Sequence, residues 1–294
     1  MKIGLSSYSL AGAMNRGEMD ILGVIRWCAE AGAEQIELVP LGGFMPSNDP
    51  ALCKEIVRTA QESGIELGNY SIGGCLMSEN ADELRAEIER IKHEVDTAAS
   101  MGIKNFRTDV ASFGGSFEQN SIGSFLRLLP QLAAGAAEIA DYAARYGMNV
   151  NVENHGWFMN GSERVRMLVE AVARKNYGLQ LDVGNFVCVD EDPVTAVKRD
   201  LPLAKVVHFK DFYIRRSQTV ELLNAGGGCW FPSQFGTALQ GSVVGWGDVD
   251  VYTIAGLIRE SGFDGVVSLE FEGAEECKMA SKAGLTILKK LLRD

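Results

Sequence analysis

Short apolar runs alternate with longer amphipathic stretches along the whole chain. The apolar runs predict strands near residues 2–7, 34–39, 65–70, 104–109, 148–153, 178–182, 204–209 and 265–270. The stretches between them predict helices near 18–31, 50–63, 80–101, 122–146, 161–175, 193–200, 249–261 and 274–292. The 80–101 stretch is the clearest, because Leu84, Ile88, Ile91 and Val95 recur at helical spacing among charged residues.

Glycine follows the predicted end of a helical stretch at several places, and a short apolar run comes next. The pairs are Ala31-Gly32, Ser63-Gly64, Met101-Gly102, Tyr146-Gly147, Tyr177-Gly178 and Ser261-Gly262. Glycine just past a helix end allows the left-handed conformation that closes the helix. The short loop then leads into a strand, as it does in repeated αβ units.

Eight strands alternating with eight helices predict either a closed barrel or an open, doubly wound sheet. The count and the length of 294 residues favour a single (β/α)8 TIM barrel spanning residues 1–294. The chain lacks the G-x-G-x-x-G fingerprint after its first strand and has no G-x-x-x-x-G-K-[ST] motif. Dinucleotide-binding and P-loop folds are therefore not expected.

One connection, at about 210–247, is much longer than the others. It contains Gly226-Gly227-Gly228 and the aromatic residues Trp230, Phe231, Phe235 and Trp246. A loop of this length inside a compact domain is usually functional or disordered. It is either a surface excursion with its own small cluster or a lid over the barrel mouth, and we favour the lid because its aromatic side chains need something to cover.

The candidate chemistry lies where the last four predicted strands end. Glu153, Asp182, His208 and Glu270 each close an apolar run, and active sites of α/β barrels lie at the carboxyl ends of the strands. Side chains alternate across a strand, so the three carboxylates point into the barrel when Val152, Leu181 and Leu269 face the helices. By the same parity, a polar layer one step below contains Asn151, Gln180 and Ser268.

Three buried carboxylates in one place repel each other and need a cation. One such residue alone is usually a solvated strand end or a hydrogen-bonded core histidine, but four on consecutive strands indicate a site. Carboxylates with one imidazole suit a divalent metal ion, with Mn²⁺ preferred and Mg²⁺, Co²⁺ or Zn²⁺ as alternatives.

Composition narrows the function classes. The net charge is −11 and no dense basic run occurs, so neither nucleic acid nor a membrane surface is an expected partner. No secretory leader or apolar stretch of membrane-spanning length is apparent, which predicts a cytoplasmic protein. Six cysteines without a CxxC pair are expected to be mostly buried, reduced thiols.

Four runs at the predicted strand ends form a recognisable set, namely Val152-Glu153-Asn154-His155, Leu181-Asp182-Val183-Gly184-Asn185, Val207-His208-Phe209-Lys210-Asp211 and Ser268-Leu269-Glu270. This set resembles the xylose isomerase-like TIM-barrel superfamily, which includes sugar isomerases, ketose 3-epimerases, inosose dehydratases and endonuclease IV. The segment Gly245-Trp246-Gly247-Asp248-Val249-Asp250 looks like the part of the family that precedes its seventh helix. The resemblance covers essentially the whole chain.

The resemblance implies that Glu153, Asp182, His208 and Glu270 hold the metal ion. It also implies that Glu153 and Glu270 are acid/base groups on opposite faces of a carbohydrate substrate, which react by proton transfer through a metal-stabilised enediolate. Asn185 departs from the ketose 3-epimerases, which have a substrate-binding histidine there, and Ile214 stands where they have an arginine. Endonuclease IV needs more histidines than the three in this chain.

Further substrate-binding candidates are His155, Asn185, Lys210, Glu37 and Trp246. Glu37 could equally be salt-bridged, and Lys210 could instead pair with Asp211. Trp157 and Trp246 could stack on a sugar or pack under the long loop. Arg107 and Asp109 are expected to form an internal ion pair.

The principal hypothesis is a metal-dependent isomerase or epimerase acting on a sugar, keto-sugar or related polyol. A lyase or dehydratase acting on a keto-sugar or inosose shares the first step and is the alternative, which an additional acid near the leaving group would favour. A barrel that only binds a ligand would have no need of four intact metal ligands. We also expect self-association into a homo-oligomer, and an enzyme that oxidises the substrate first is a further candidate partner.

Overall fold

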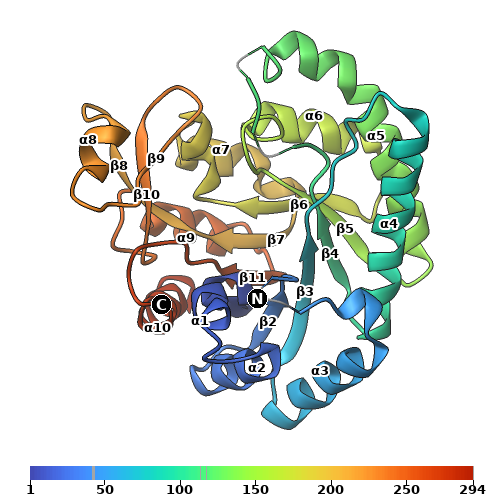
Figure 1. Ribbon diagram of the computed structural model, residues 1–294, viewed down its shortest axis with the longest axis horizontal. Coiled ribbons are helices and arrows are strands. Elements are labelled where there is room, and N and C mark those ends of the chain that lie inside the picture. Colours follow the sequence, from blue (N-terminus) through green and yellow to red (C-terminus); the bar gives the residue numbers. More distant parts are fainter. Residues whose placement is uncertain (42–43, 113, 117, 294) are drawn as a thin grey trace.

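The computed structural model describes residues 1–41, 44–112, 114–116 and 118–293. Eight parallel strands close into a barrel in the order β1-β11-β7-β6-β5-β4-β3-β2. The strands are β1 (Lys2–Ser6), β2 (Gln35–Leu38), β3 (Glu66–Ile72), β4 (Asn105–Thr108), β5 (Asn149–Glu153), β6 (Tyr177–Asp182), β7 (Ala204–Phe209) and β11 (Val266–Leu269). The predicted (β/α)8 TIM barrel is confirmed, and Figure 1 shows the strands gathered at its centre.

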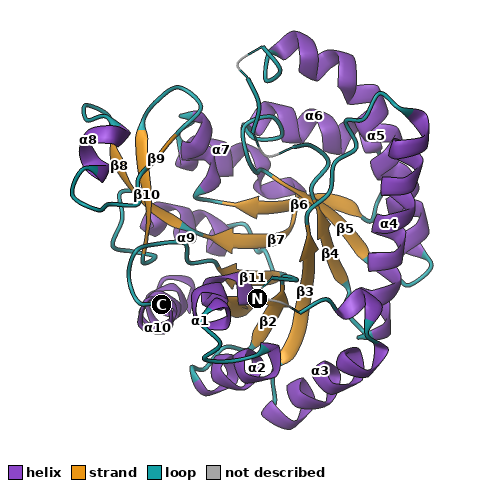
Figure 2. Cartoon of the chain, in the orientation of Figure 1, coloured by secondary structure: helices purple, strands orange, loops and turns teal. Residues whose placement is uncertain are grey.

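Helices surround the barrel, as the purple and orange elements of Figure 2 show. The α-helices are α1 (Ala11–Asn15), α2 (Ile21–Glu30), α3 (Pro50–Ser63), α4 (Ala81–Ser100), α5 (Ile122–Ala144), α6 (Ser162–Val172), α7 (Pro193–Asp200), α8 (Val220–Asn224), α9 (Val251–Glu260) and α10 (Cys277–Arg293). Short 3₁₀ helices are η1 (Ser7–Leu10), η2 (Pro46–Asn48), η3 (Asn185–Val189) and η4 (Leu201–Leu203). No helix in the described ranges combines the length and apolarity needed to cross a membrane.

Local sequence signals set the ends of the helices. At α3, the Asp49 side chain accepts the amide of Leu52, Pro50 occupies the first turn, and Gly64 ends the helix with a φ of 67°. The pair Tyr177-Gly178 is an exception to the predicted pattern, because Gly178 lies inside β6 and Ala173 takes the left-handed position after α6. A Cβ on Gly178 would lie 2.9 Å from the Leu203 carbonyl oxygen, so close packing requires glycine there.

Apolar and polar side chains are buried in two different places in the barrel. Aliphatic and aromatic side chains fill the space between strands and helices, whereas the barrel interior holds the predicted polar layer of Asn151, Gln180 and Ser268, all fully buried. Within it, Gln35 Nε2 donates to Ser268 Oγ over 2.9 Å and Asn69 Nδ2 donates to Gln180 Oε1 over 2.6 Å. These bonds form a polar floor beneath the carboxyl ends of the strands.

The segment 210–247, predicted as one long loop, contains regular structure. Strands β8 (Asp211–Arg215), β9 (Phe231–Pro232) and β10 (Ala238–Ser242) form an antiparallel sheet in the order β8-β10-β9, and α8 lies in the same segment. Figure 1 shows this insertion in orange to one side of the barrel. Pairing of β8 with β10 from Asp211–Ser242 to Arg215–Ala238 satisfies backbone groups that a bare loop would expose to water.

The cysteines are all free thiols, as the sequence predicted. Only Cys28, Cys53 and Cys277 are buried, so the expectation of mostly buried thiols holds for half of them. Cys75 and Cys188 are half-buried, and Cys229 is exposed in the insertion.

Candidate metal centre and active site

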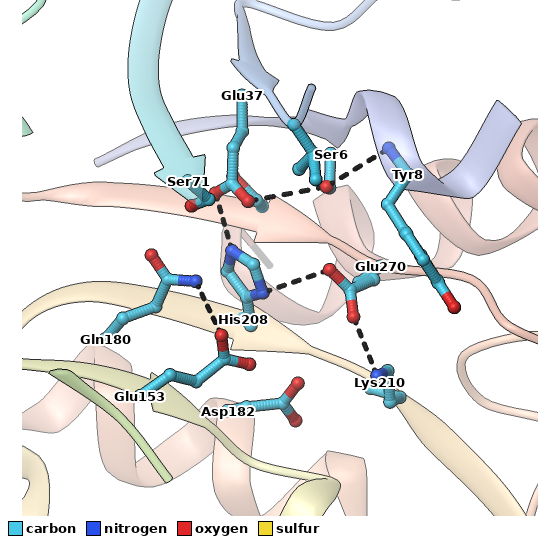
Figure 3. Close-up of polar contacts among 12 residues, drawn as sticks. Ser6, Tyr8, Glu37, Ser71, Glu153, Gln180, Asp182, His208, Lys210 and Glu270 are labelled. Atoms are coloured by element: carbon cyan, nitrogen blue, oxygen red, sulfur yellow. Dashed lines mark hydrogen bonds and ion pairs between the residues drawn. The ribbon is translucent and has the colours of Figure 1, made fainter. Parts of the chain in front are cut away.

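Four neighbouring barrel strands carry the four predicted metal ligands to one place. Glu153 ends β5, Asp182 ends β6, His208 lies in β7, and Glu270 directly follows β11. Strand register aligns them, since Asp182 pairs with His208 and Ser268, two residues before Glu270, pairs with the same histidine. Figure 3 shows the four side chains converging above the barrel interior.

The ligand atoms of these side chains belong to two overlapping groups of three, each of which could hold a metal ion. One atom each from Glu153, Asp182 and His208 lie within 4.8 Å of one another, as do one atom each from Glu37, His208 and Glu270. His208 belongs to both groups and lies at their junction. Together the two groups contain the four predicted ligands and Glu37. The sequence analysis had given Glu37 as a residue that binds the substrate or forms a salt bridge.

His208 is buried between carboxylates. Its Nε2 lies 2.6 Å from Glu37 Oε2, whereas its Nδ1 has no hydrogen-bond partner and lies 3.6 Å from Glu270 Oε2. Burial opposes a charge on the ring, but Glu37 and Glu270 outweigh it and raise the pKa of His208 to about 10. The imidazole is thus held on one nitrogen and presents the other to the carboxylates (Figure 3).

Asp182 is fully buried, and only one of its two carboxylate oxygens accepts hydrogen bonds. Its Oδ1 accepts the amides of Gly184, over 2.8 Å, and Asn185, over 3.1 Å, but Oδ2 has no hydrogen-bond partner. Burial raises the pKa of Asp182 to about 7, although Lys210 acts in the opposite direction. A buried carboxylate oxygen without a donor is costly, and a cation would relieve that cost.

Each of the two candidate acid/base carboxylates lies beside a different cation. Lys210 Nζ lies 2.7 Å from Glu270 Oε1, and Arg107 Nη2 lies 2.7 Å from Glu153 Oε2. Burial opposes ionisation of Glu270, but Lys210 and His208 outweigh it and lower its pKa to about 2. Glu153 also accepts hydrogen bonds from Gln180 Nε2 and Asn185 Nδ2, each over 3.1 Å.

A second carboxylate shares each of these cations nearer the solvent. Arg107 Nη2 is 2.7 Å from Asp109 Oδ1, and Lys210 Nζ is 3.2 Å from Glu272 Oε2. The predicted ion pair of Arg107 with Asp109 is therefore present, and it extends to Glu153.

A cavity of about 690 Å³ opens over this centre. Charged and polar side chains from the barrel line its base, while Val39, Leu41, Trp157 and the insertion residues Phe212, Phe231 and Pro232 supply apolar surface. The insertion therefore contributes a wall to the cavity. Of the four aromatic residues on which the expected lid was based, Phe231 is among the cavity-lining residues and Trp230, Phe235 and Trp246 are not, so the lid stays a prediction.

The other predicted substrate-binding residues take different places. His155 lines the cavity with its Nδ1 3.3 Å from Asp109 Oδ1, and Asn185 lines it while donating to Glu153. Burial opposes a charge on His155, but the contact with Asp109 outweighs it and raises the pKa of the ring. Glu37 also borders the cavity, yet it is fully buried and bonded to Ser6 Oγ, Asn69 Nδ2 and His208.

Lys210 and Asp211 do not pair with each other, contrary to one of the two sequence interpretations. Lys210 points into the cavity, whereas the Asp211 carboxylate accepts the amides of Phe212, Gly245, Gly247 and Val249. Successive residues of a strand point to opposite sides, which separates the two side chains. Trp246 lies in the chain between Gly245 and Gly247, whose amides donate to Asp211. Its side chain is 49% exposed and is not among the cavity-lining residues.

Sequence reasoning missed Tyr8 and Glu272. Both line the cavity, and Tyr8 Oη donates to Glu272 Oε1 over 3.2 Å. Tyr8 lies two residues beyond the end of β1 and Glu272 lies three beyond β11. The rule that barrel sites form at the carboxyl ends of strands would have found both, had it been applied to loops as well as strand ends.

Sequence comparison identifies relatives of this chain. The sequence profile of a family described as xylose isomerase-like TIM barrel matches residues 25–291. A curated inosose dehydratase from Lacticaseibacillus casei is 28% identical over 151 residues, which cover 48% of this chain and 46% of that protein. The match therefore spans about half the length of the curated relative.

Solved structures share the fold over nearly the whole chain. A probable 3-DHS dehydratase from Bacillus anthracis has a TM-score of 0.73 and 20% identity, covering 98% of this chain and 99% of its own. A D-psicose 3-epimerase from Clostridium cellulolyticum H10 has a TM-score of 0.74 and 15% identity, covering 100% of both chains. The zinc-bound IOLI protein has a TM-score of 0.73 and 19% identity, covering 99% of this chain and 96% of its own.

Proposed function

Because the chain belongs to the xylose isomerase-like TIM barrel family, we propose that it is a divalent-metal-dependent enzyme that isomerises or epimerises a sugar, keto-sugar or related polyol. The proposed ligands are Glu153, Asp182, His208 and Glu270. The proposed acid/base groups are Glu153 and Glu270, which are separated in the barrel by β6 and β7.

One observation carries the metal part of the proposal. Asp182 Oδ2 and His208 Nδ1 are both buried without a hydrogen-bond partner, and they belong to residues whose donor atoms lie within 4.8 Å of each other. Two buried atoms that can each coordinate a metal, and that have no hydrogen-bond partner, are expected where a cation binds. Three carboxylates and one imidazole suit Mn²⁺, which accepts both oxygen and imidazole ligands, and the zinc-bound IOLI neighbour makes Zn²⁺ the first alternative.

When bound, the cation would supply Lewis-acid stabilisation of negative charge on substrate oxygens. The remaining work falls to the protein. One of Glu153 and Glu270 removes the proton from the carbon beside the substrate carbonyl, and the electron pair of that C–H bond forms the double bond of an enediolate. The other glutamate takes up a proton from water and delivers it to the opposite face in an epimerase or to the neighbouring carbon in an isomerase, where the hydroxyl proton moves to the former carbonyl oxygen. The first glutamate then gives its proton to water, so that both carboxylates are restored. Arg107 and Lys210 orient the two carboxylates through their 2.7 Å contacts.

A dehydratase is the second candidate, because the cavity holds acids beyond the two glutamates. Tyr8 and His155 both line it, and either one could protonate a departing hydroxyl group so that it leaves as water. The curated relative and one structural neighbour carry dehydratase names, which supports keeping this candidate. The first step, removal of the proton beside the carbonyl, is the same in both reactions.

Proton exchange separates the candidates. The Mn²⁺-loaded protein is incubated in D₂O with ketoses, keto-sugars and inososes, and NMR follows deuterium incorporation and product structure. Exchange with a rearranged product supports the isomerase or epimerase, whereas exchange with loss of water selects the dehydratase. Glu270→Gln should slow exchange by about 10²- to 10⁴-fold, the usual contribution of one acid/base group. A protein that binds no divalent metal contradicts the proposal.

A further inference from the structure

The balance of charge around the cavity bears on the class of substrate. Five carboxylates line the cavity, namely Glu37, Asp109, Glu153, Glu270 and Glu272. Glu153 and Glu270 are proposed ligands of the divalent ion, which leaves Glu37, Asp109 and Glu272 against the two permanent cations Arg107 and Lys210. Each cation already lies between two carboxylates, at 2.7 and 2.7 Å for Arg107 and at 2.7 and 3.2 Å for Lys210. The positive charge of each cation is therefore already offset by two neighbouring carboxylates.

The place where α/β barrels usually bind phosphate is acidic here. That place is formed by the loops after the seventh and eighth barrel strands, which in this chain follow β7 and β11. The loop after β11 brings Glu270 and Glu272 to the cavity, and both accept from the single lysine of the loop after β7. A phosphate group there would meet two carboxylates.

The first two backbone amides after β11 are already engaged within the protein. The Glu270 amide donates to the Phe209 carbonyl over 2.9 Å, and the Phe271 amide donates to Ser9 Oγ over 3.0 Å. The loop is also covered by the insertion, because a Cβ on Gly241 of β10 would lie 1.3 Å from the Glu272 carbonyl oxygen. No space remains between β10 and this peptide for a phosphate group.

We propose that the cavity binds an uncharged, polyhydroxylated ketone and discriminates against phosphorylated or carboxylated analogues, with Glu272 as the main source of that discrimination. The inference rests on the proposed function, since it names the substrate class of the same site. Glu272 repels an anion directly and also keeps Lys210 engaged. The hydroxyl groups of a neutral sugar can donate to the carboxylates, which a phosphate dianion cannot do.

The test compares matched pairs of ligands on the metal-loaded protein. D-fructose is paired with D-fructose 6-phosphate and D-ribulose with D-ribulose 5-phosphate, and calorimetric Kd and deuterium exchange in D₂O are measured for each. We expect the uncharged member to exchange and the phosphorylated member to bind at least about tenfold more weakly. Equal or tighter binding of the phosphorylated members, with exchange, overturns this inference and leaves the proposed function standing.

Two variants locate the discrimination. Glu272→Lys should bring the Kd of the phosphorylated members at least about tenfold closer to that of the uncharged members, because it removes one of the two carboxylates beside Lys210 and adds a cation. Glu260→Lys makes the same charge change on the exposed end of α9 and should leave the ratio unchanged. An equal shift in both variants would assign the effect to net charge and overturn the role of Glu272. If the metal-loaded protein exchanges neither these pairs nor the wider set of ketones, the proposed function fails and this inference fails with it.

Discussion

Glu37 Oε2 lies 2.6 Å from His208 Nε2, although the two residues are 171 positions apart in the chain. The contact orients the imidazole so that Nδ1, which lacks a hydrogen bond, faces Glu270 at 3.6 Å. Histidines that bind metals usually donate their second ring nitrogen to a carboxylate, which fixes the ring and its tautomer. Glu37 is therefore expected to position His208, and its own bonds to Ser6 and Asn69 hold it in place.

Replacing Glu37 should weaken metal binding without removing a ligand. Glu37→Gln replaces a charged acceptor with an amide, so we expect the Kd for Mn²⁺ or Zn²⁺ to rise about 10- to 100-fold. Competition with a chelator measures the Kd, and ¹⁵N NMR of the His208 ring reports which nitrogen carries the proton in the metal-loaded protein. Glu94→Gln is the matched control, since Glu94 is also buried and accepts from Tyr70 Oη. An unchanged Kd in Glu37→Gln would assign the contact to folding alone.

Asp182→Asn should have opposite effects on the metal-free protein and on metal binding. The asparagine Oδ1 can still accept the amides of Gly184 and Asn185, while the buried charge disappears. We expect the metal-free variant to unfold at a temperature equal to or higher than the parent, because an unpaired buried carboxylate is costly. The rise in Tm on adding Mn²⁺ should be largely lost. A full metal-induced rise in Asp182→Asn would remove this residue from the ligand set.

The apolar wall of the insertion should act on substrate binding and leave the metal alone. Phe231 lines the cavity, so Phe231→Ala is expected to raise KM about tenfold, corresponding to the loss of one aromatic contact. Phe235→Ala also removes a phenyl ring from the insertion, but from an exposed position, and should leave KM unchanged. Both variants should retain the parental Kd for Mn²⁺. A similar rise in KM for both would mean that the segment was generally disrupted.

Stability should depend on pH through Asp200, which lies away from the cavity. Its carboxylate oxygens are buried without hydrogen bonds, and burial raises its pKa to about 7 although Arg166 lies 3.7 Å away. Between pH 4 and 7 the folded protein thus holds a proton that the unfolded chain has lost, so this residue lowers stability as pH rises through that window. Asp200→Asn should raise the free energy of unfolding by about 1–3 kcal/mol at pH 8 and change it little near pH 4.

Urea unfolding at several pH values tests the Asp200 prediction. Asp141→Asn is the control, because Asp141 also faces an arginine, Arg174, but is exposed at the surface. Its substitution should have a small effect that does not grow toward pH 8. A uniform gain for Asp200→Asn across the whole pH range would contradict the titration and indicate a change in packing.

Regular periodicity made the barrel predictable, because strands buried on both faces are short apolar runs and the helices around them are amphipathic. The same regularity singled out Glu153, Asp182, His208 and Glu270, since each ends such a run in the sequence and the three carboxylates have inward parity. Glu37 was identified as a candidate, but its partner was not, because a contact between β2 and β7 across the barrel leaves no trace in local sequence.

The insertion escaped prediction for a different reason. Strands β8 and β10 are stabilised by each other, and β9 contains only two residues, so none carries a strong pattern alone. Tyr8 and Glu272 were overlooked because loop residues gain their place from the elements on either side. The pairing of Lys210 with Glu270 and Glu272 likewise depends on the direction in which the chain leaves β7.

Asp211 lies at the boundary between the barrel and the insertion. Its carboxylate holds the amides of Gly245, Gly247 and Val249, so the two ends of the insertion are fastened together at the point where the chain leaves and rejoins the barrel. The stretch between Phe212 and Val244 is therefore a segment that can be replaced as a unit, provided that Lys210 and the hydrogen bonds of Asp211 are kept. Laboratory evolution of new specificities in this scaffold would best randomise that segment, because its changes reach the apolar wall and spare the ligand-bearing strands.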